Sequence, residues 1–429
     1  MRKAKSVDLF QTTGDRLSQP TLTSHGHFIH RSYKYRIYPN DEQKELLEKH
    51  FGCCRFVYNH FLATRKSAYE SDKKTLSLFE THHMCSNMKK MDEFSWLNEV
   101  YSHALQASLK NLDCAYQKFF RKTAKFPRFH SKRDKQSVTF PDNVKVVDGK
   151  LKLPKFKTAI DMVMHRPMPG TICHATVSKT RTGKYFVSFS CVEECEFFEE
   201  TVNAVGIDLG IKEMAVCSNG ERIANPKFLE RGEKHLKYLQ RQVSRKKKGS
   251  NNRNRARRSL SRFHEKVANR RNDYIHKFTT RIVRENQAIC VEDLNVKGME
   301  SNHHLAKSIA SVSFGEIVRQ LGYKSAWYGR SFVKVERFYP SSKTCNHCGH
   351  INRELTLKDR EWTCKSCGET IDRDFNAALN IRDRGIEILS GDGLSSDVKQ
   401  KHEEASQLCE SMNHGSPRNV GVVTRGQSH

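Results

Sequence analysis

Apolar and polar residues follow different periods along the chain, and the changes of period divide it into segments. Residues Tyr33–Tyr38 alternate as a strand does, and an acidic helix start follows directly at Asp41. Apolar residues then recur at helical spacing as far as about Lys122, which predicts a helical bundle. Between Ser137 and Val192 the period returns to two, which predicts antiparallel strands in a small barrel or sandwich.

The strand Tyr33–Tyr38 needs a sheet to join, and the strands of 137–192 are the nearest. If they pair, the helical bundle is an insertion into a β domain, an inference from economy alone. The residues up to Arg31 are polar and aperiodic, and are expected to form a mobile extension. Beyond Leu389 the composition predicts a disordered tail.

A second domain is predicted from Val202, where three short strands follow one another. The first ends in Asp208, and an Asn219-Gly220 turn joins the second to a third around Ile223. A meander with an aspartate in its first strand is how an RNase H-like α/β fold opens. Taken alone, Asp208 is equally compatible with a surface position on an edge strand.

Two further carboxylates stand where an apolar element meets polar sequence. Glu292 ends a buried-looking strand, and Asp374 lies at the start of a helix predicted over 376–388. Clustered carboxylates repel one another unless cations hold them. Two Mg²⁺ ions bridged by Asp208, Glu292 and Asp374 would activate a water and stabilise the leaving oxygen of a phosphodiester. The set therefore predicts a magnesium-dependent catalytic centre.

Two Cys-x-x-Cys pairs lie in a separate short segment, with fifteen residues between them. Glycines directly follow both pairs, where a knuckle turn needs a positive φ. This spacing predicts a zinc ribbon whose metal is structural, because four thiolates leave no open position for water. The ligands would be Cys345, Cys348, Cys364 and Cys367.

Charge narrows the class of partner. The 429 residues include 75 Lys+Arg against 48 Asp+Glu, a net charge of +27, which calls for a polyanion such as nucleic acid. No apolar run approaches the ~20 residues that span a bilayer, and the start lacks a signal-peptide core, so no membrane partner is expected. The cysteines are expected to be reduced thiols in a cytoplasmic protein.

Three segments are candidates for nucleic-acid contact. The first is a polar helix face with Ser102, His103 and Gln106, which a plain solvated face explains equally well. In the second, basic residues alternate with aromatics, which favours nucleic acid over packing; it includes Arg121, Lys122 and Arg128. The third is the basic tip of a predicted helical hairpin, with Arg245, Lys246, Lys247, Lys248, Arg253 and Arg255.

Several of these motifs together resemble the TnpB family. They are Tyr35-Arg36-Ile37-Tyr38-Pro39, Phe56-Val57-Tyr58-Asn59, Gly206-Ile207-Asp208-Leu209-Gly210, Glu292-Asp293-Leu294, and the ribbon followed by Asp372-Arg373-Asp374-Phe375-Asn376-Ala377-Ala378. TnpB proteins are RNA-guided DNA endonucleases of insertion sequences and ancestor-like relatives of type V CRISPR effectors. The resemblance covers about Tyr33 to Ile388.

The resemblance implies an α+β multidomain fold, with a β-barrel-like wedge domain interrupted by a helical recognition bundle, then a RuvC-type nuclease domain with an inserted zinc ribbon. The expected segments are the extension 1–31, the wedge strand 32–40, the recognition domain 41–124, the wedge domain 125–201, the nuclease domain 202–341 and 371–389, the ribbon 342–370 and the tail 390–429.

The resemblance also implies the partners and the roles of the site residues. It implies one protein per guide RNA, transcribed from the element's right end, and a double-stranded DNA target in a prokaryotic cytoplasm. Asp208, Glu292 and Asp374 match the family's catalytic acids, and the face with Ser102, His103 and Gln106 falls where the family reads a short flanking motif. Two alternatives stay open: a nuclease-inactive RNA-guided repressor, and a transposase that needs no RNA.

Overall fold

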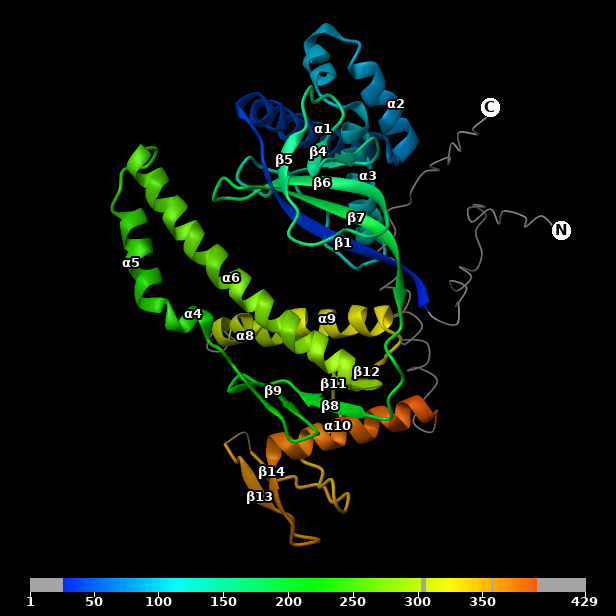
Figure 1. The fold of residues 1–429 in the computed structure, drawn as a ribbon, viewed down its shortest axis with the longest axis vertical. Helices are drawn as coiled ribbons and strands as arrows, with labels where there is room; N and C mark the ends of the chain where they lie inside the picture. Colours follow the sequence, from blue (N-terminus) through cyan, green and yellow to red (C-terminus); the bar gives the residue numbers. More distant parts are fainter. Residues whose placement is uncertain (1–25, 302–305, 357, 392–429) are drawn as a thin grey trace, which may run out of the picture.

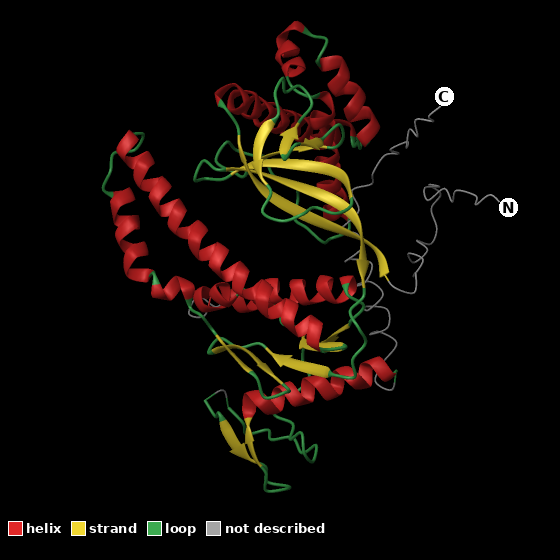
Figure 2. Cartoon of the chain, viewed as in Figure 1, coloured by secondary structure: helices red, strands yellow, loops and turns green. Residues whose placement is uncertain are grey.

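The computed structural model describes residues 26–301, 306–356 and 358–391. Its amino-terminal part is built on one antiparallel sheet of seven strands, which Figures 1 and 2 show beside its helices. The strand order is β2-β6-β7-β1-β5-β4-β3. The bounds are β1 Gly26–Tyr38, β2 Gln136–Phe140, β3 Lys145–Val147, β4 Lys150–Lys152, β5 Ile160–Val163, β6 Thr171–Lys179 and β7 Tyr185–Glu196. β2 and β3 are its edges, so the sheet is open, where the sequence suggested a closed barrel or a sandwich.

Strand β1 joins this sheet, as predicted, between β7 and β5. It begins at Gly26, so the prediction of a mobile extension as far as residue 31 was wrong for 26–31. The alternation continues there, with Ile29 and Tyr33 buried, but His27, His30 and Arg31 conceal it in the sequence. Residues 1–25 of that extension, and 392–429 of the tail, lie outside the described residues.

Helices enter the chain between β1 and β2 and pack on this sheet. They are α1 (Asp41–Asp72), α2 (Leu78–Met88), the 3₁₀ helix η1 (Asp92–Glu99) and α3 (Ser102–Phe120). Asn40 and Gln43 form a capping box at the start of α1, which satisfies two backbone N–H groups. One apolar core joins these helices to the sheet, so the predicted bundle is present and interrupts the β structure.

The second part of the chain is a three-layer α/β unit. Its sheet has the order β10-β9-β8-β11-β12, in which β8, β11 and β12 are parallel. The strands are β8 Ala204–Asp208, β9 Glu213–Cys217, β10 Arg222–Ala224, β11 Ala288–Glu292 and β12 Ser331–Val335. Helices α6 (Asn251–Glu285), α8 (Ala306–Val312) and α9 (Phe314–Trp327) cover one face, and α10 (Arg373–Ser390) covers the other (Figure 1).

The remaining elements are a helical hairpin and a ribbon. α4 (Phe228–Arg231) and α5 (Glu233–Ser244) lead to a basic turn and back along α6, which confirms the predicted hairpin. The short helix α7 (Val296–Glu300) follows β11. The ribbon carries β13 (Glu361–Thr363) paired with β14 (Thr370–Asp372), directly before α10. Within the described part of the chain, no helix combines the length and apolarity needed to cross a bilayer.

Candidate metal centres

Two of the predicted acids end neighbouring strands. β8 and β11 run parallel, and Ile207 pairs with Val291. Asp208 and Glu292 are the next residues on the two strands, so both lie at the carboxyl edge of the sheet. Ligands of open α/β sheets bind at this edge.

The third acid reaches this edge because α10 lies directly against the sheet. Gly206 of β8 makes the approach possible: a Cβ there would lie 2.0 Å from the carbonyl oxygen of Ala378 and 2.5 Å from the backbone nitrogen of Arg382. Gly385 does the same on the helix side, facing Cys290 of β11. Asp374, in the first turn of α10, is thereby held beside Asp208.

The electrostatics of the three acids reflect this closeness. Burial, together with the charges of Asp374 and Glu292, raises the pKa of Asp208 to about 7 against the opposing effect of Arg373. Burial and the neighbouring Asp293 also raise the pKa of Glu292. Carboxylates with such neighbours favour a proton or a bound cation.

Arginines surround this cluster, and the sequence reasoning missed them. Arg360 Nη1 lies 3.1 Å from Asp374 Oδ2, and Arg373 Nη2 lies 2.9 Å from Asp374 Oδ1. Asp372 has another role: it caps α10 by accepting from the Phe375 N–H at 2.8 Å, and it pairs with Arg222 at 2.8 Å. The sequence offered one signal for these arginines, which is the position of Arg373 between two acids in Asp372-Arg373-Asp374.

The donor set fits hard divalent cations. Carboxylate oxygens are the ligands that Mg²⁺ prefers, and the raised pKa of Asp208 shows negative charge in need of compensation. Among the described residues, only the four ribbon cysteines have their metal-ligating atoms all within 4.8 Å of one another. The three carboxylates are more widely spaced, and arginines partner Asp374.

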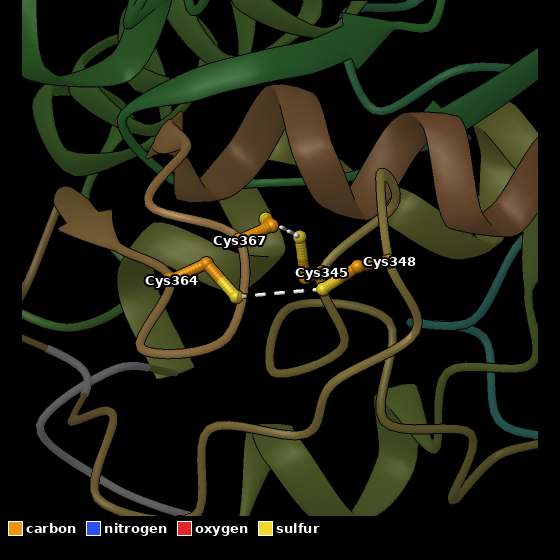
Figure 3. Close-up of side chains that lie close together, drawn as sticks. All are labelled: Cys345, Cys348, Cys364 and Cys367. Atoms are coloured by element: carbon orange, nitrogen blue, oxygen red, sulfur yellow. Dashed lines mark hydrogen bonds between the residues drawn. The ribbon is translucent and has the colours of Figure 1, made fainter.

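The four cysteines are gathered as a tetrahedral metal requires (Figure 3). Their Sγ atoms lie within 4.8 Å of one another, with Cys345–Cys367 at 3.7 Å and Cys348–Cys364 at 3.6 Å. Tetrahedral Zn–S bonds of ~2.3 Å place sulfurs about 3.8 Å apart, so the site fits zinc. Gly349 and Gly368 have φ of 75° and 76°, as predicted for the two knuckles.

The first knuckle is fastened to the helix that carries Asp374. The Asn346 N–H donates to Asn376 Oδ1 at 2.9 Å, and Asn346 Nδ2 donates to Asn380 Oδ1 at 3.1 Å. Asn380 Nδ2 donates to the carbonyls of Ser341 and Thr344, both at 2.7 Å. Asn376 and Asn380 are 2% and 4% exposed, so these bonds are shielded from water.

The polar face at the start of α3 is partly engaged within the protein. Ser102 Oγ accepts from Lys89 Nζ at 2.7 Å, and His103 Nδ1 lies 2.6 Å from Asp142 Oδ2. Asp142 also accepts from the Tyr101 hydroxyl. His103 stays half-exposed and Gln106 partly exposed, so the face reaches solvent beside the β2–β3 loop.

The basic candidates lie at the surface, although Lys246 and Arg253 are partly covered. Arg121, Lys122 and Arg128 are exposed, but Phe126 among them packs edge-on against Tyr116 and Phe119 of α3. At the hairpin tip, Arg253 Nη1 donates to the Lys246 carbonyl at 2.7 Å and so braces the turn. The exposed side chains there are Arg245, Lys247, Lys248 and Arg255, with Lys246 partly covered.

Comparison with known families places three segments. Residues 190–303 match OrfB_IS605, described as "Probable transposase", and 314–381 match the Cas12f1-like TNB domain. Residues 29–74 match a helix-turn-helix domain of the OrfB_IS605 type. In the structure, this last range holds most of β1 and the single long helix α1.

The relatives extend over nearly the whole chain. A Streptomyces pristinaespiralis protein named as an RNA-guided DNA endonuclease is 40% identical, over 88% of this chain and 98% of its own. Escherichia coli (strain K12) InsQ, also named as an RNA-guided DNA endonuclease, is 31% identical with the same coverage. The fold is similar to that in a Cas12f1-sgRNA-target DNA complex, with a TM-score of 0.52, 15% identity, and 83% and 99% of the two chains covered.

Identity at this level along almost the full length of these relatives is far beyond a shared fold. The chain belongs to the TnpB family, as its motifs indicated.

Proposed function

We propose that this protein is an RNA-guided DNA endonuclease that hydrolyses DNA in one magnesium-dependent, RuvC-like site. The observation that carries the proposal is the electrostatic cluster of Asp208, Glu292 and Asp374 at the carboxyl edge of the sheet. Two relatives more than 30% identical are named for the same activity, which supports it.

Each part of the chain has a role in this proposal. Asp208, Glu292 and Asp374 would hold Mg²⁺, which when bound supplies an activated water and stabilises the leaving oxygen. Arg360 and Arg373 neutralise Asp374 until metal and DNA arrive. The hairpin tip and the segment with Arg121, Lys122 and Arg128 neutralise phosphates, while Ser102, His103 and Gln106 read a short motif beside the target. A guide RNA from the element's right end supplies the sequence, one protein per RNA.

The decisive experiment removes one acid. Asp208→Ala should abolish cleavage of a guide-matched DNA while leaving RNA and target binding within about twofold, because the carboxylate would hold the metal needed for hydrolysis and has no role in guide pairing. Asp273→Ala, which removes an exposed carboxylate of α6 that pairs with Lys277, is the matched control. Unchanged cleavage by the Asp208→Ala protein refutes the site.

Sequencing the RNA that copurifies with the protein separates the proposal from its alternatives. A discrete RNA is expected, and its absence would favour a transposase that needs none. If the wild-type protein binds a guide-matched DNA in Mg²⁺ but does not cleave it, a repressor would be favoured.

A further inference from the structure

The α5–α6 hairpin holds a cavity that the proposed reaction does not use. It has a volume of about 640 Å³ and lies between α4 and α5 on one side and residues 259–270 of α6 on the other. Cavities of roughly 300–1,000 Å³ are typical of sites for small organic groups. The volume of this cavity lies within that range, so the cavity has room for a group of the size of a single nucleotide.

Basic side chains surround the cavity without acidic partners. Arg231, Arg262, Lys266 and Arg270 line it and are exposed. Across residues 26–301, 306–356 and 358–391, none of the four forms an ion pair with a carboxylate.

The acids beside them in sequence are engaged elsewhere. Glu233 pairs with Lys237 and Lys307, and Glu265 pairs with Lys184. The cavity therefore carries uncompensated positive charge, which favours phosphate groups.

Aromatic rings form another part of the cavity lining, and one of them is fixed in place. Phe263 and His235 lie with ring centroids 5.6 Å apart, and Phe228 also lines the cavity. Gly232 admits the Phe263 ring, since a Cβ there would lie 2.6 Å from Phe263 Cζ. A ring beside unpaired cations is the arrangement that binds single strands, with bases stacked and phosphates neutralised.

We propose that this cavity receives one unstacked nucleotide of a single-stranded nucleic acid. Its base lies against Phe263, and its flanking phosphates lie near Arg262 and Lys266. A duplex cannot supply this ligand, because its bases are stacked within the helix. The inference rests on the proposed function for one step: pairing of a guide RNA with one DNA strand leaves other RNA or DNA single-stranded.

Binding of a 20-residue oligothymidylate to the full chain, measured at several salt concentrations, tests the aromatic and the basic parts of the cavity lining separately. Phe263→Leu keeps an apolar side chain and removes the aromatic face, and should weaken binding about fivefold or more with an unchanged salt slope. Arg262→Gln should weaken it similarly and lower the salt slope by about 0.7, the value for one phosphate contact on a single strand.

The matched control is Arg258→Gln, which removes the same charge one turn away outside the cavity. Its effect should stay below about twofold. Equal losses in Arg258→Gln and Arg262→Gln, or full affinity in Phe263→Leu, would overturn the proposal. Thermal melting of each variant checks that the fold is kept.

Ultraviolet cross-linking of the full chain with its copurifying RNA and a matched DNA identifies the strand. The tryptic peptide of residues 263–266 should carry a nucleotide adduct. A ribonucleotide adduct assigns the cavity to RNA and a deoxyribonucleotide adduct to DNA, and either supports it. Adducts elsewhere on α6 with none on this peptide overturn it. Neither readout requires cleavage, so a chain that fails to cut DNA can still pass both tests.

Discussion

At the scale of single residues, Asp208 combines two properties that oppose each other. Its place beside Asp374 and Glu292 suits it to hold a cation, but the same place makes its ionised form costly without one. Burial and these two charges raise its pKa to about 7, from 3.8 in an unfolded chain. The folded state therefore binds a proton more tightly than the unfolded state does. The stability that this proton contributes is complete below about pH 4 and is lost as the pH rises through 7.

Asp208→Asn should remove this dependence on pH. In the absence of divalent metal, the variant should melt a few degrees above the wild type at pH 8, with a smaller difference at pH 5, because the amide never carries the charge. Differential scanning calorimetry with a chelator present measures this. Asp161→Asn is the control, since Asp161 is exposed, is paired with Lys150 and lies in the other sheet. An equal difference at both pH values would contradict the role given to burial and repulsion.

At the scale of elements, the zinc knuckle and the acid-bearing helix form one unit. Asn380 of α10 donates to two knuckle carbonyls that also accept from Asn376, so Asn380→Ala removes two buried hydrogen bonds at a cost of about 1–3 kcal/mol. We expect faster loss of zinc to a chromogenic chelator and weaker apparent affinity for Mg²⁺ in cleavage. Lys365→Ala, which breaks an exposed ion pair in the same ribbon, should change neither. Faster zinc loss with an unchanged Mg²⁺ requirement would show that the knuckle does not position Asp374.

The contact between α10 and β8 gives a second prediction at this scale. Gly206→Ala places a Cβ 2.0 Å from a backbone oxygen of α10, so the helix must move away from the sheet. The expected cost is at least ~1–3 kcal/mol, together with a severe loss of cleavage as Asp374 leaves Asp208. Gly315→Ala in α9, where nothing lies within 4 Å, should be neutral or slightly stabilising. Normal cleavage by Gly206→Ala would disprove the requirement for close packing.

Local signals explain which elements the sequence could predict. The hairpin turn at Gly220, the two knuckle glycines and the period of α3 depend on neighbouring residues, and all of them were foreseen. The start of β1 at Gly26 was not, because Gly26 pairs with Glu196 of β7, about 170 residues away in the chain. The amides of Asn376 and Asn380 and the arginines around Asp374 gain their meaning only from contacts made after folding.

At the scale of the whole molecule, the two sheets are joined through a buried charge. Glu193 of β7 is 4% exposed, pairs with Arg31 Nη1 at 2.7 Å and accepts from the Tyr33 hydroxyl. Arg31 in turn lies over the ring of Trp327, 4.6 Å from its centroid, and donates to the Tyr328 hydroxyl at 3.3 Å. The seven-stranded sheet is thereby tied to the end of α9 in the α/β unit.

Glu193→Gln keeps the shape of this junction and removes its charge, leaving Arg31 without an ion-pair partner there. We expect a loss of about 1–3 kcal/mol in stability, since a buried hydrogen bond to a charged group is lost. The segment after β7 should also loosen, because Phe198 stacks on Tyr328 at a centroid distance of 4.1 Å. Chymotrypsin should then cleave after Phe197 or Phe198 several-fold faster, whereas exposed Glu194→Gln should match the wild type. If both variants are cut at the same rate, the charge does not hold the two units together, and the other contacts of this segment do so, such as the Phe198–Tyr328 stack and the bond from Arg330 Nη2 to the Glu199 carbonyl.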